Sequence, residues 1–267
     1  MKTSYLDRGE GRIAYEIAGV GPLVVLLHGM GDLRWVFRST TPALVEAGFR
    51  VAAMDLRGHG ESDATFRTYD DEAAAADALA LIDHLGGPAL LIGNSMGAGA
   101  AVVAAAESPG AVAGLGLLGP FVRDPKANPL LPLLLRASLL RPWGPAAWRS
   151  YHRASYPTRP PADLAEHERR IGAALRGTRW RAFQRTARTT HEPARLRLPR
   201  GGAPSLVVMG TKDRDWPDPT AEARFVAQAL HAELLLVQGA GHYPMAEFPE
   251  VVNPVLVAFA RRVFGRG

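Results

Sequence analysis

Gly93-Asn94-Ser95-Met96-Gly97 follows directly on the apolar run Ala89–Ile92, and this junction decides how the chain folds. A continuous apolar run of this kind predicts a strand that is buried on both faces. The pattern Gly-x-Ser-x-Gly predicts a sharp turn from that strand into a helix, because glycine close on each side relieves crowding of the backbone. Ser95 is therefore expected at the edge of a sheet, in a strained and accessible position.

Taken alone, this pattern is weak in a chain with 28 glycines, so the surrounding segments have to support it. Strand-like and helix-like segments alternate along most of the chain. After a hairpin over 4–18, strands are expected at 23–27, 50–54, 89–93, 111–118, 206–209 and 234–237. Helices are expected at about 35–47, 70–85, 96–108, 219–231 and 249–264. This alternation predicts an α/β fold with a doubly wound, mostly parallel sheet.

Residues 121–200 interrupt the alternation, because they contain no convincing strand. Prolines mark several expected helix starts in this segment. About four helices are expected, near 130–140, 145–156, 161–176 and 179–190. We therefore expect a core domain formed by residues 1–120 and 201–267, with residues 121–200 inserted as a helical cap, or lid.

Composition limits the class of protein. The chain has 267 residues, which fits one large domain with an insertion, and its hydrophobic content of 47% suffices for a buried core. No apolar run approaches the roughly 20 residues needed to cross a bilayer, and the first residues lack a signal-peptide segment. There are no cysteines, which excludes disulfides, thiolate zinc sites and a cysteine nucleophile. We expect a soluble cytoplasmic protein without stable membrane insertion.

The net charge of +5 is unevenly distributed. Residues 121–200 contain 16 Arg and one Lys against five acids, so this segment carries +12 and the remainder −7. Arg outnumbers Lys 28 to 3, which is typical of the coding bias of a high-GC genome. The basic segment either attracts an anionic substrate or forms a solvated basic face. No nucleic-acid recognition fold accompanies the charge, so no nucleic-acid partner is expected.

Candidate functional residues follow the expected strands, where ligands bind in open α/β sheets. Ser95 is the first of them. His28-Gly29-Met30-Gly31 follows strand 23–27, and a glycine-rich loop here frees backbone amides. The amides of Met30 and Met96 are the expected donors to a developing oxyanion. His28 itself is expected to anchor this loop.

Two further strand ends carry an acid and a base. Asp213 and Asp215 follow strand 206–209, and both qualify as a carboxylate that orients a histidine. Gly241-His242 follows strand 234–237. Of the eight histidines, His242 combines a strand end, a glycine-rich loop and a position downstream of both serine and acid. His242 is therefore the expected general base.

The order Ser95, Asp213, His242 resembles the α/β-hydrolase family. The resemblance extends over 23–259 and also rests on Asp55-Leu56-Arg57-Gly58-His59-Gly60-Glu61-Ser62, which matches the family's structural D-x-R-G-x-G-x-S turn. The family's Gly-x-x-Asp pattern favours Asp213 over Asp215, which remains the second choice for the acid. A serine in the elbow is similar to that of esterases, thioesterases, C–C hydrolases and perhydrolases, whereas dehalogenases and epoxide hydrolases carry aspartate there.

The resemblance implies a serine hydrolase that cleaves a carboxylic ester through an acyl-enzyme intermediate. The implied substrate is a small acyl compound, and neither a metal nor an organic cofactor is expected. One alternative is a thioesterase or a C–C bond hydrolase of a small-molecule pathway. Another is a non-hydrolytic ligand-binding or biosynthetic protein on the same fold. The oligomeric state is not predicted.

Apolar residues of the basic segment either line an acyl or aromatic pocket or pack the core of the segment itself. These residues are Leu130, Leu131, Leu133, Leu134, Leu135, Leu139, Leu140, Trp143 and Trp148.

Overall fold

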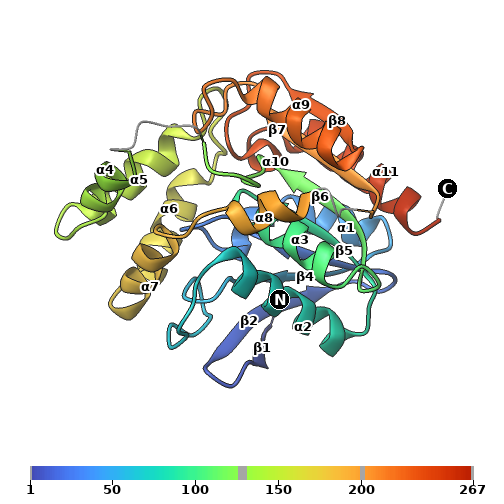
Figure 1. Ribbon diagram of the computed structural model, residues 1–267, viewed down its shortest axis with the longest axis horizontal. Helices are drawn as coiled ribbons and strands as arrows, with labels where there is room; N and C mark the ends of the chain where they lie inside the picture. The colour runs from blue at the N-terminus through green and yellow to red at the C-terminus, as the bar shows by residue number, and fades with distance from the viewer. Residues whose placement is uncertain (1, 126–130, 199–201, 266–267) are drawn as a thin grey trace.

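The computed structural model describes residues 2–125, 131–198 and 202–265, and for 131–133 it describes the backbone alone. Eight strands form one sheet in the order β1-β2-β4-β3-β5-β6-β7-β8 (Figure 1). They are β1 Thr3–Asp7, β2 Arg12–Ala18, β3 Leu23–Leu27, β4 Arg50–Met54, β5 Ala89–Asn94, β6 Val112–Leu118, β7 Ser205–Gly210 and β8 Glu233–Val237. Only the pairs that involve β2 are antiparallel. The predicted α/β fold with a mostly parallel sheet is confirmed.

Helices cover both faces of the sheet, because the side chains of each strand point alternately to opposite faces. In β3, Val25 and Leu27 face a core that includes α2 Asp71–Leu85, α3 Met96–Glu107 and α9 Pro219–Leu230. Val24 and Leu26 face the other core, which includes α1 Thr40–Glu46 and α11 Pro249–Val263. In the part of the chain that the structure describes, no helix is long and apolar enough to cross a membrane.

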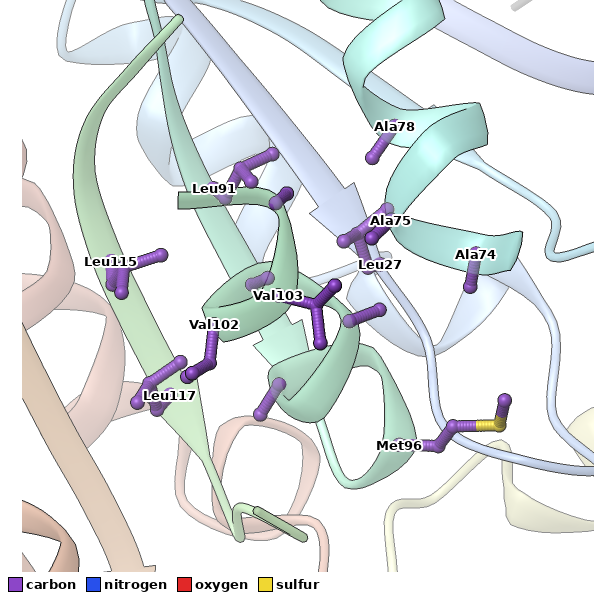
Figure 2. Packing of buried hydrophobic residues seen from close by; sticks show 14 of the residues in the cluster. Leu27, Ala74, Ala75, Ala78, Leu91, Met96, Val102, Val103, Leu115 and Leu117 are labelled. Atoms are coloured by element: carbon purple, nitrogen blue, oxygen red, sulfur yellow. The ribbon is translucent and has the colours of Figure 1, made fainter. Parts of the chain in front are cut away.

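Helix α3 packs unusually small side chains against the sheet and against α2. Figure 2 shows Val102 and Val103 of α3 between the sheet residues Leu91 and Leu115 and the alanines of α2. Small residues allow the helix to begin close to the end of β5, which fixes the position of Ser95.

Five helices lie between β6 and β7, and the described residues of this segment form no strand. They are α4 Leu131–Ser138, α5 Gly144–Ala154, α6 Leu164–Ala174, α7 Thr178–Thr186 and α8 Glu192–Arg197. We call α4 to α7 the helical insertion; these helices lie together at one side of the molecule, away from the C-terminus (Figure 1). Helix α8 instead packs on α3, with Ala194 in the core beneath it.

The insertion has a small core of its own. Leu33, from the loop after β3, is buried in it together with Trp148, Trp180 and Phe183. Of the residues predicted to line a pocket, Leu139 and Trp148 belong to this core and Leu135 packs against it, whereas Leu134, Leu140 and Trp143 are exposed. Leu130 lies outside the described residues, as do the side chains of Leu131 and Leu133.

The helix predicted at 35–47 is wrong as a single element. The chain forms a short 3-10 helix, η1 Arg34–Phe37, and then α1, which begins at Thr40. Pro42 explains the break, because proline fits the first turn of a helix but would clash with the preceding turn in a helix interior. Two short helices, α8 and α10 Pro244–Glu247, were not predicted, since four to six residues are too few to display a helical period.

Candidate active site

Ser95 lies in the turn between β5 and α3 and has the backbone angles φ +55° and ψ −122°. A positive φ is strained for a residue with a side chain, and such strain is typical of functional sites. The flanking glycines make the turn possible. A Cβ on Gly93 would lie 2.2 Å from the carbonyl oxygen of Gly97, and a Cβ on Gly97 would lie 2.3 Å from that of Leu27. The turn therefore requires glycine at both positions.

Two backbone amides beside this turn are free to donate. Met96 is the first residue of α3, so its N–H has no acceptor within the helix. The N–H of Met30, in the loop after β3, makes no hydrogen bond with another described residue. This loop passes close to the serine, because a Cβ on Gly29 would lie 2.8 Å from the Cβ of Ser95. The two amides predicted to form an oxyanion hole thus lie in neighbouring segments, one in the loop after β3 and the other at the start of α3.

His242 and Asp213 form a direct pair. His242 Nδ1 lies 2.8 Å from Asp213 Oδ2, and both side chains are buried. Asp213 follows β7 and His242 follows β8, so neighbouring parallel strands deliver them to the same edge of the sheet. The two loops touch, because a Cβ on Gly210 would lie 2.2 Å from the carbonyl oxygen of Gly241.

The loop of His242 also lies against the serine turn. Asn94, which precedes Ser95, donates its side-chain N–H to the carbonyl of His242 at 3.2 Å. Phe121 donates its backbone N–H to the carbonyl of Ser95 at 3.3 Å and places its ring edge-on against the His242 imidazole. The turn that carries Ser95 therefore lies against the loop that carries the His242–Asp213 pair. The Ser95 hydroxyl makes no hydrogen bond with another described residue.

A second carboxylate lies beside the same imidazole. Asp215 Oδ2 is 3.3 Å from His242 Nδ1, and the N–H of Asp215 donates to Asp213 Oδ1 at 3.1 Å. Tyr151 of α5 donates its hydroxyl to the carboxylate of Asp215, 2.6 Å from each oxygen. Both acids named from the sequence are thus in contact with His242, and Asp213 is the closer one.

These two charges control the protonation of His242. Burial disfavours the charged imidazolium, but the carboxylates of Asp213 and Asp215 outweigh it and raise the pKa of His242 to about 9. Burial also raises the pKa of Asp215. Burial and the adjacent Asp215 keep the pKa of Tyr151 well above its usual value, so its hydroxyl stays a neutral donor.

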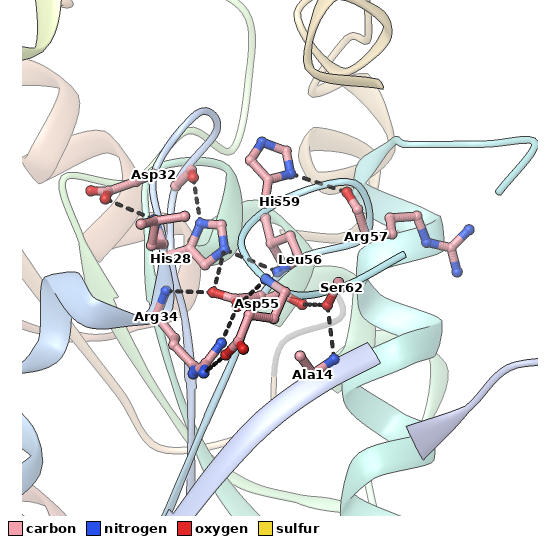
Figure 3. A network of polar contacts seen from close by, with 12 residues as sticks. Ala14, His28, Asp32, Arg34, Asp55, Leu56, Arg57, His59 and Ser62 are labelled. Carbon is pink, nitrogen blue, oxygen red and sulfur yellow. Dashed lines mark hydrogen bonds and ion pairs between the residues drawn. The ribbon is translucent and has the colours of Figure 1, made fainter. Parts of the chain in front are cut away.

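His28 holds the loop that carries Met30. Its ring is fully buried: Nδ1 donates to the carbonyl of Gly29 at 2.7 Å, and Nε2 accepts the N–H of Leu56 at 2.9 Å (Figure 3). Burial lowers the pKa of His28 to about 4, so the ring is neutral and can accept at Nε2. This geometry agrees with the expected anchoring role.

Asp55 anchors the turn after β4. Its carboxylate accepts the backbone N–H of Arg34 at 2.8 Å and that of Glu61 at 2.9 Å, and it pairs with the Arg34 guanidinium (Figure 3). Ser62 donates its hydroxyl to the carbonyl of Asp55 and accepts the N–H of Ala14. The motif at 55–62 is therefore structural: its hydrogen bonds tie the turn after β4 to Arg34 and to Ala14 of β2.

Helix α5 and the residue directly after it supply three contacts that the sequence analysis missed. Trp148 Nε1 donates to the carbonyl of Gly31 at 3.0 Å, beside Met30. Tyr151 holds Asp215, and the carbonyl of Ser155, directly after the helix, accepts the N–H of His242 at 3.1 Å. The one local indication of these contacts in the sequence was the spacing of Trp148 and Tyr151, which are three residues apart and so lie on one face of the helix.

A family model for the alpha/beta hydrolase family matches residues 24–255. This chain belongs to the alpha/beta hydrolase family. The α/β hydrolase is 34% identical over 257 residues to the dihydrolipoyllysine-residue acetyltransferase component of the acetoin cleaving system of Pseudomonas putida. That match covers 93% of this chain and 66% of the relative, so the chain spans slightly less than two thirds of that protein.

Two further similarities cover nearly the full length of both partners. The α/β hydrolase is 30% identical over 271 residues to a 2-hydroxy-6-oxononadienedioate/2-hydroxy-6-oxononatrienedioate hydrolase of Burkholderia vietnamiensis, covering 96% of this chain and 93% of the relative. A thermophilic esterase from Thermogutta terrifontis has a similar structure, with a TM-score of 0.80 and 25% identity, covering 98% of this chain and 99% of that chain. These similarities support a hydrolase, with relatives that act on different bonds.

Proposed function

We propose that this α/β hydrolase is a serine hydrolase that cleaves a carboxylic ester. The observation that carries the proposal is the contact between the Ser95 turn and the loop of His242, made by the hydrogen bond from Asn94 to the carbonyl of His242. This hydrogen bond holds the strained turn of Ser95 against the loop of His242, whose imidazole pairs with Asp213. Such a group of side chains is the arrangement that acyl transfer requires.

In the proposed reaction, Ser95 Oγ attacks the ester carbonyl carbon and transfers its proton to His242 Nε2. The N–H groups of Met30 and Met96 stabilise the oxyanion. Asp213, bonded to Nδ1, fixes the orientation of the imidazole and stabilises its charged form. The leaving alcohol takes the proton from His242, and a water molecule activated by the same imidazole then releases the acid.

The helical insertion, within residues 121–200, is proposed as a cap over this site. Support comes from α5, whose contacts reach the loop of Gly31, the carboxylate of Asp215 and the backbone of His242. A cap fixed at these points positions the substrate and limits the access of bulk water, while the one water molecule that releases the acid still has to reach the carbonyl.

A fluorophosphonate probe tests the proposal directly, because it reacts with an activated serine in folded protein. We expect one labelled peptide that contains Ser95, and no label in the Ser95→Ala variant. The Ser108→Ala variant, which changes a serine at the other end of α3, should label like the unmodified protein. If Ser95 stays unlabelled in folded protein, the proposal fails and the non-hydrolytic alternative gains support.

A C–C bond hydrolase is the second candidate, and the near full-length similarity to the Burkholderia vietnamiensis hydrolase favours it. The same side chains could serve that reaction, so labelling does not separate the two. A panel of p-nitrophenyl esters, acyl thioesters and a 2-hydroxy-6-oxo-dienoate does. Ester hydrolysis with the highest kcat/KM supports the first proposal, and a preference for the dienoate replaces it with the second.

A further inference from the structure

Three buried side chains form a cluster outside the candidate active site. Asp32 lies in the loop after β3, His152 on α5 and His167 on α6, and all three are essentially inaccessible to solvent. His167 Nε2 lies 2.6 Å from Asp32 Oδ1, and His152 Nε2 lies 3.9 Å from Asp32 Oδ2. One ligand atom from each residue lies within 4.8 Å of the others.

The carboxylate of Asp32 lacks the usual cationic partner. Among the described residues, the ion pairs of Asp32 involve His152 and His167 and neither arginine nor lysine. An unpaired buried carboxylate is strongly destabilising, so this site requires a compensating positive charge. That charge is either a proton on an imidazole or a bound cation.

The remaining polar atoms favour a cation over a proton. Asp32 Oδ1 accepts the N–H of Leu33 at 2.7 Å and faces His167 Nε2, so a shared proton satisfies this oxygen. That shared proton leaves Asp32 Oδ2, both ring nitrogens of His152 and Nδ1 of His167 without a hydrogen-bond partner among the described residues. Each buried polar atom left in this way costs about 1–3 kcal/mol. One metal ion could engage Asp32, His152 and His167 together.

We propose that Asp32, His152 and His167 bind a divalent transition-metal ion, with Zn²⁺ as the fitting candidate. Two imidazoles and one carboxylate are a donor set that zinc accepts, with a fourth position left for water. A tetrahedral ion with bonds of about 2.0–2.1 Å needs ligand atoms roughly 3.3 Å apart. The observed separations, 2.6 Å from His167 Nε2 to Asp32 Oδ1 and 3.9 Å from His152 Nε2 to Asp32 Oδ2, lie on either side of that value, so the side chains must rotate to surround one ion.

One residue of the cluster also borders a cavity of the insertion. His152 also lines a cavity of about 390 Å³ between α5, α6 and α7, together with Trp148 and Glu168. Arg141, Arg149 and Arg176 line the same cavity, so an ion passing through it reaches His152 beside both the carboxylate of Glu168 and these cations. Once bound, it would join α5 and α6 to a loop that carries Met30 two residues earlier. The metal would therefore hold the insertion against the core, and it takes no part in the chemistry at Ser95.

Zinc binding tests this proposal on the full chain. After treatment with a chelator, calorimetric titration with ZnCl₂ should show one ion per chain, and thermal unfolding should move to higher temperature when ZnCl₂ is added. His167→Gln and His152→Gln should each weaken zinc binding by more than about 100-fold, since even changes around metal ligands cost 10–100-fold. His84→Gln, which changes an exposed histidine of α2, should bind zinc like the unmodified protein.

The second group of close acidic and histidine side chains, Asp213, Asp215 and His242, provides a necessary comparison. Zinc binding should persist in His242→Gln. If His242→Gln abolishes binding while His167→Gln does not, or if the chelated protein binds no zinc, the proposal is overturned. Co²⁺ can be added to the folded, unmodified protein in place of zinc. A tetrahedral Co²⁺ site absorbs visible light, so the lack of this absorption would also contradict the proposal.

Discussion

Tyr151 and Asp215 join the helical insertion to the candidate active site through a hydroxyl that lies 2.6 Å from each carboxylate oxygen. Asp215 in turn contacts His242. The position of α5 is therefore coupled to the charge beside the proposed general base.

Removing this hydroxyl should destabilise the protein. Tyr151→Phe leaves the largely buried carboxylate of Asp215 without its hydroxyl donor, so we expect the free energy of unfolding in urea to fall by about 1–3 kcal/mol. Tyr156→Phe is the matched control, because the buried Tyr156 hydroxyl has no hydrogen-bond partner among the described residues. This control should change stability by less than about 0.5 kcal/mol. Equal losses in the two variants would contradict the importance of the Tyr151–Asp215 contact.

The two carboxylates beside His242 should differ in their effect on catalysis. Asp213→Asn removes the closer partner and favours the wrong tautomer of His242, so kcat should fall by about 10⁴-fold on a p-nitrophenyl ester. Asp215→Asn keeps the 2.8 Å bond between His242 and Asp213 and should cost much less, about tenfold. Comparable losses in the two variants would leave Asp213 without support as the acid.

The pH dependence of kcat/KM should show an alkaline requirement. His242 accepts the serine proton only when neutral, and its neighbours raise its pKa to about 9. Activity should therefore be low near pH 6 and rise as the pH approaches 9. Asp215→Asn removes one of the negative charges that raise this pKa, so the rising limb should move to lower pH. If the rising limb of kcat/KM stays at the same pH in this variant, Asp215 does not influence the pKa of His242.

Arg34 should be among the most sensitive residues for stability. Arg34→Met leaves Asp55, which is buried, without its cation and should lower the free energy of unfolding by about 3–5 kcal/mol. Arg12→Met removes an exposed arginine from the partly exposed Asp63 and should cost less than about 1 kcal/mol. Urea unfolding of both variants measures the difference. A similar small loss in both variants would mean that the pairing of Arg34 with Asp55 contributes little to the stability of the protein.

The arginines of residues 121–200 should have little influence on substrate choice. Seven of the 16 arginines pair with carboxylates, with Arg169 and Arg170 sharing Glu166; the seven are Arg123, Arg153, Arg159, Arg169, Arg170, Arg195 and Arg197. We expect kcat/KM for neutral and for anionic esters to change by less than about twofold between low and physiological salt. A steep loss for the anionic esters alone would instead support the attraction of an anionic substrate.

Local patterns in the sequence determined the sheet and the elements that carry the site. Buried strands such as Leu23–Leu27 are continuous apolar runs, and the turn at Ser95 needs glycine at fixed positions, so both are readable from neighbouring residues. The helix expected at 35–47 was wrong because Pro42 acts on the backbone in a way that hydrophobic spacing does not reveal. Neighbouring residues specify an element through burial and backbone geometry, and both act over a few residues.

Only the tertiary structure decided what surrounds the proposed nucleophile and base. It placed both Asp213 and Asp215 on His242, where the sequence could only rank them. It also brought Tyr151 to Asp215, and His167 to Asp32 across 135 positions of chain. The contacts of Tyr151 and His167 depend on how the helical insertion packs against the core. That packing is set by the shapes of surfaces distant in sequence, which no local pattern records.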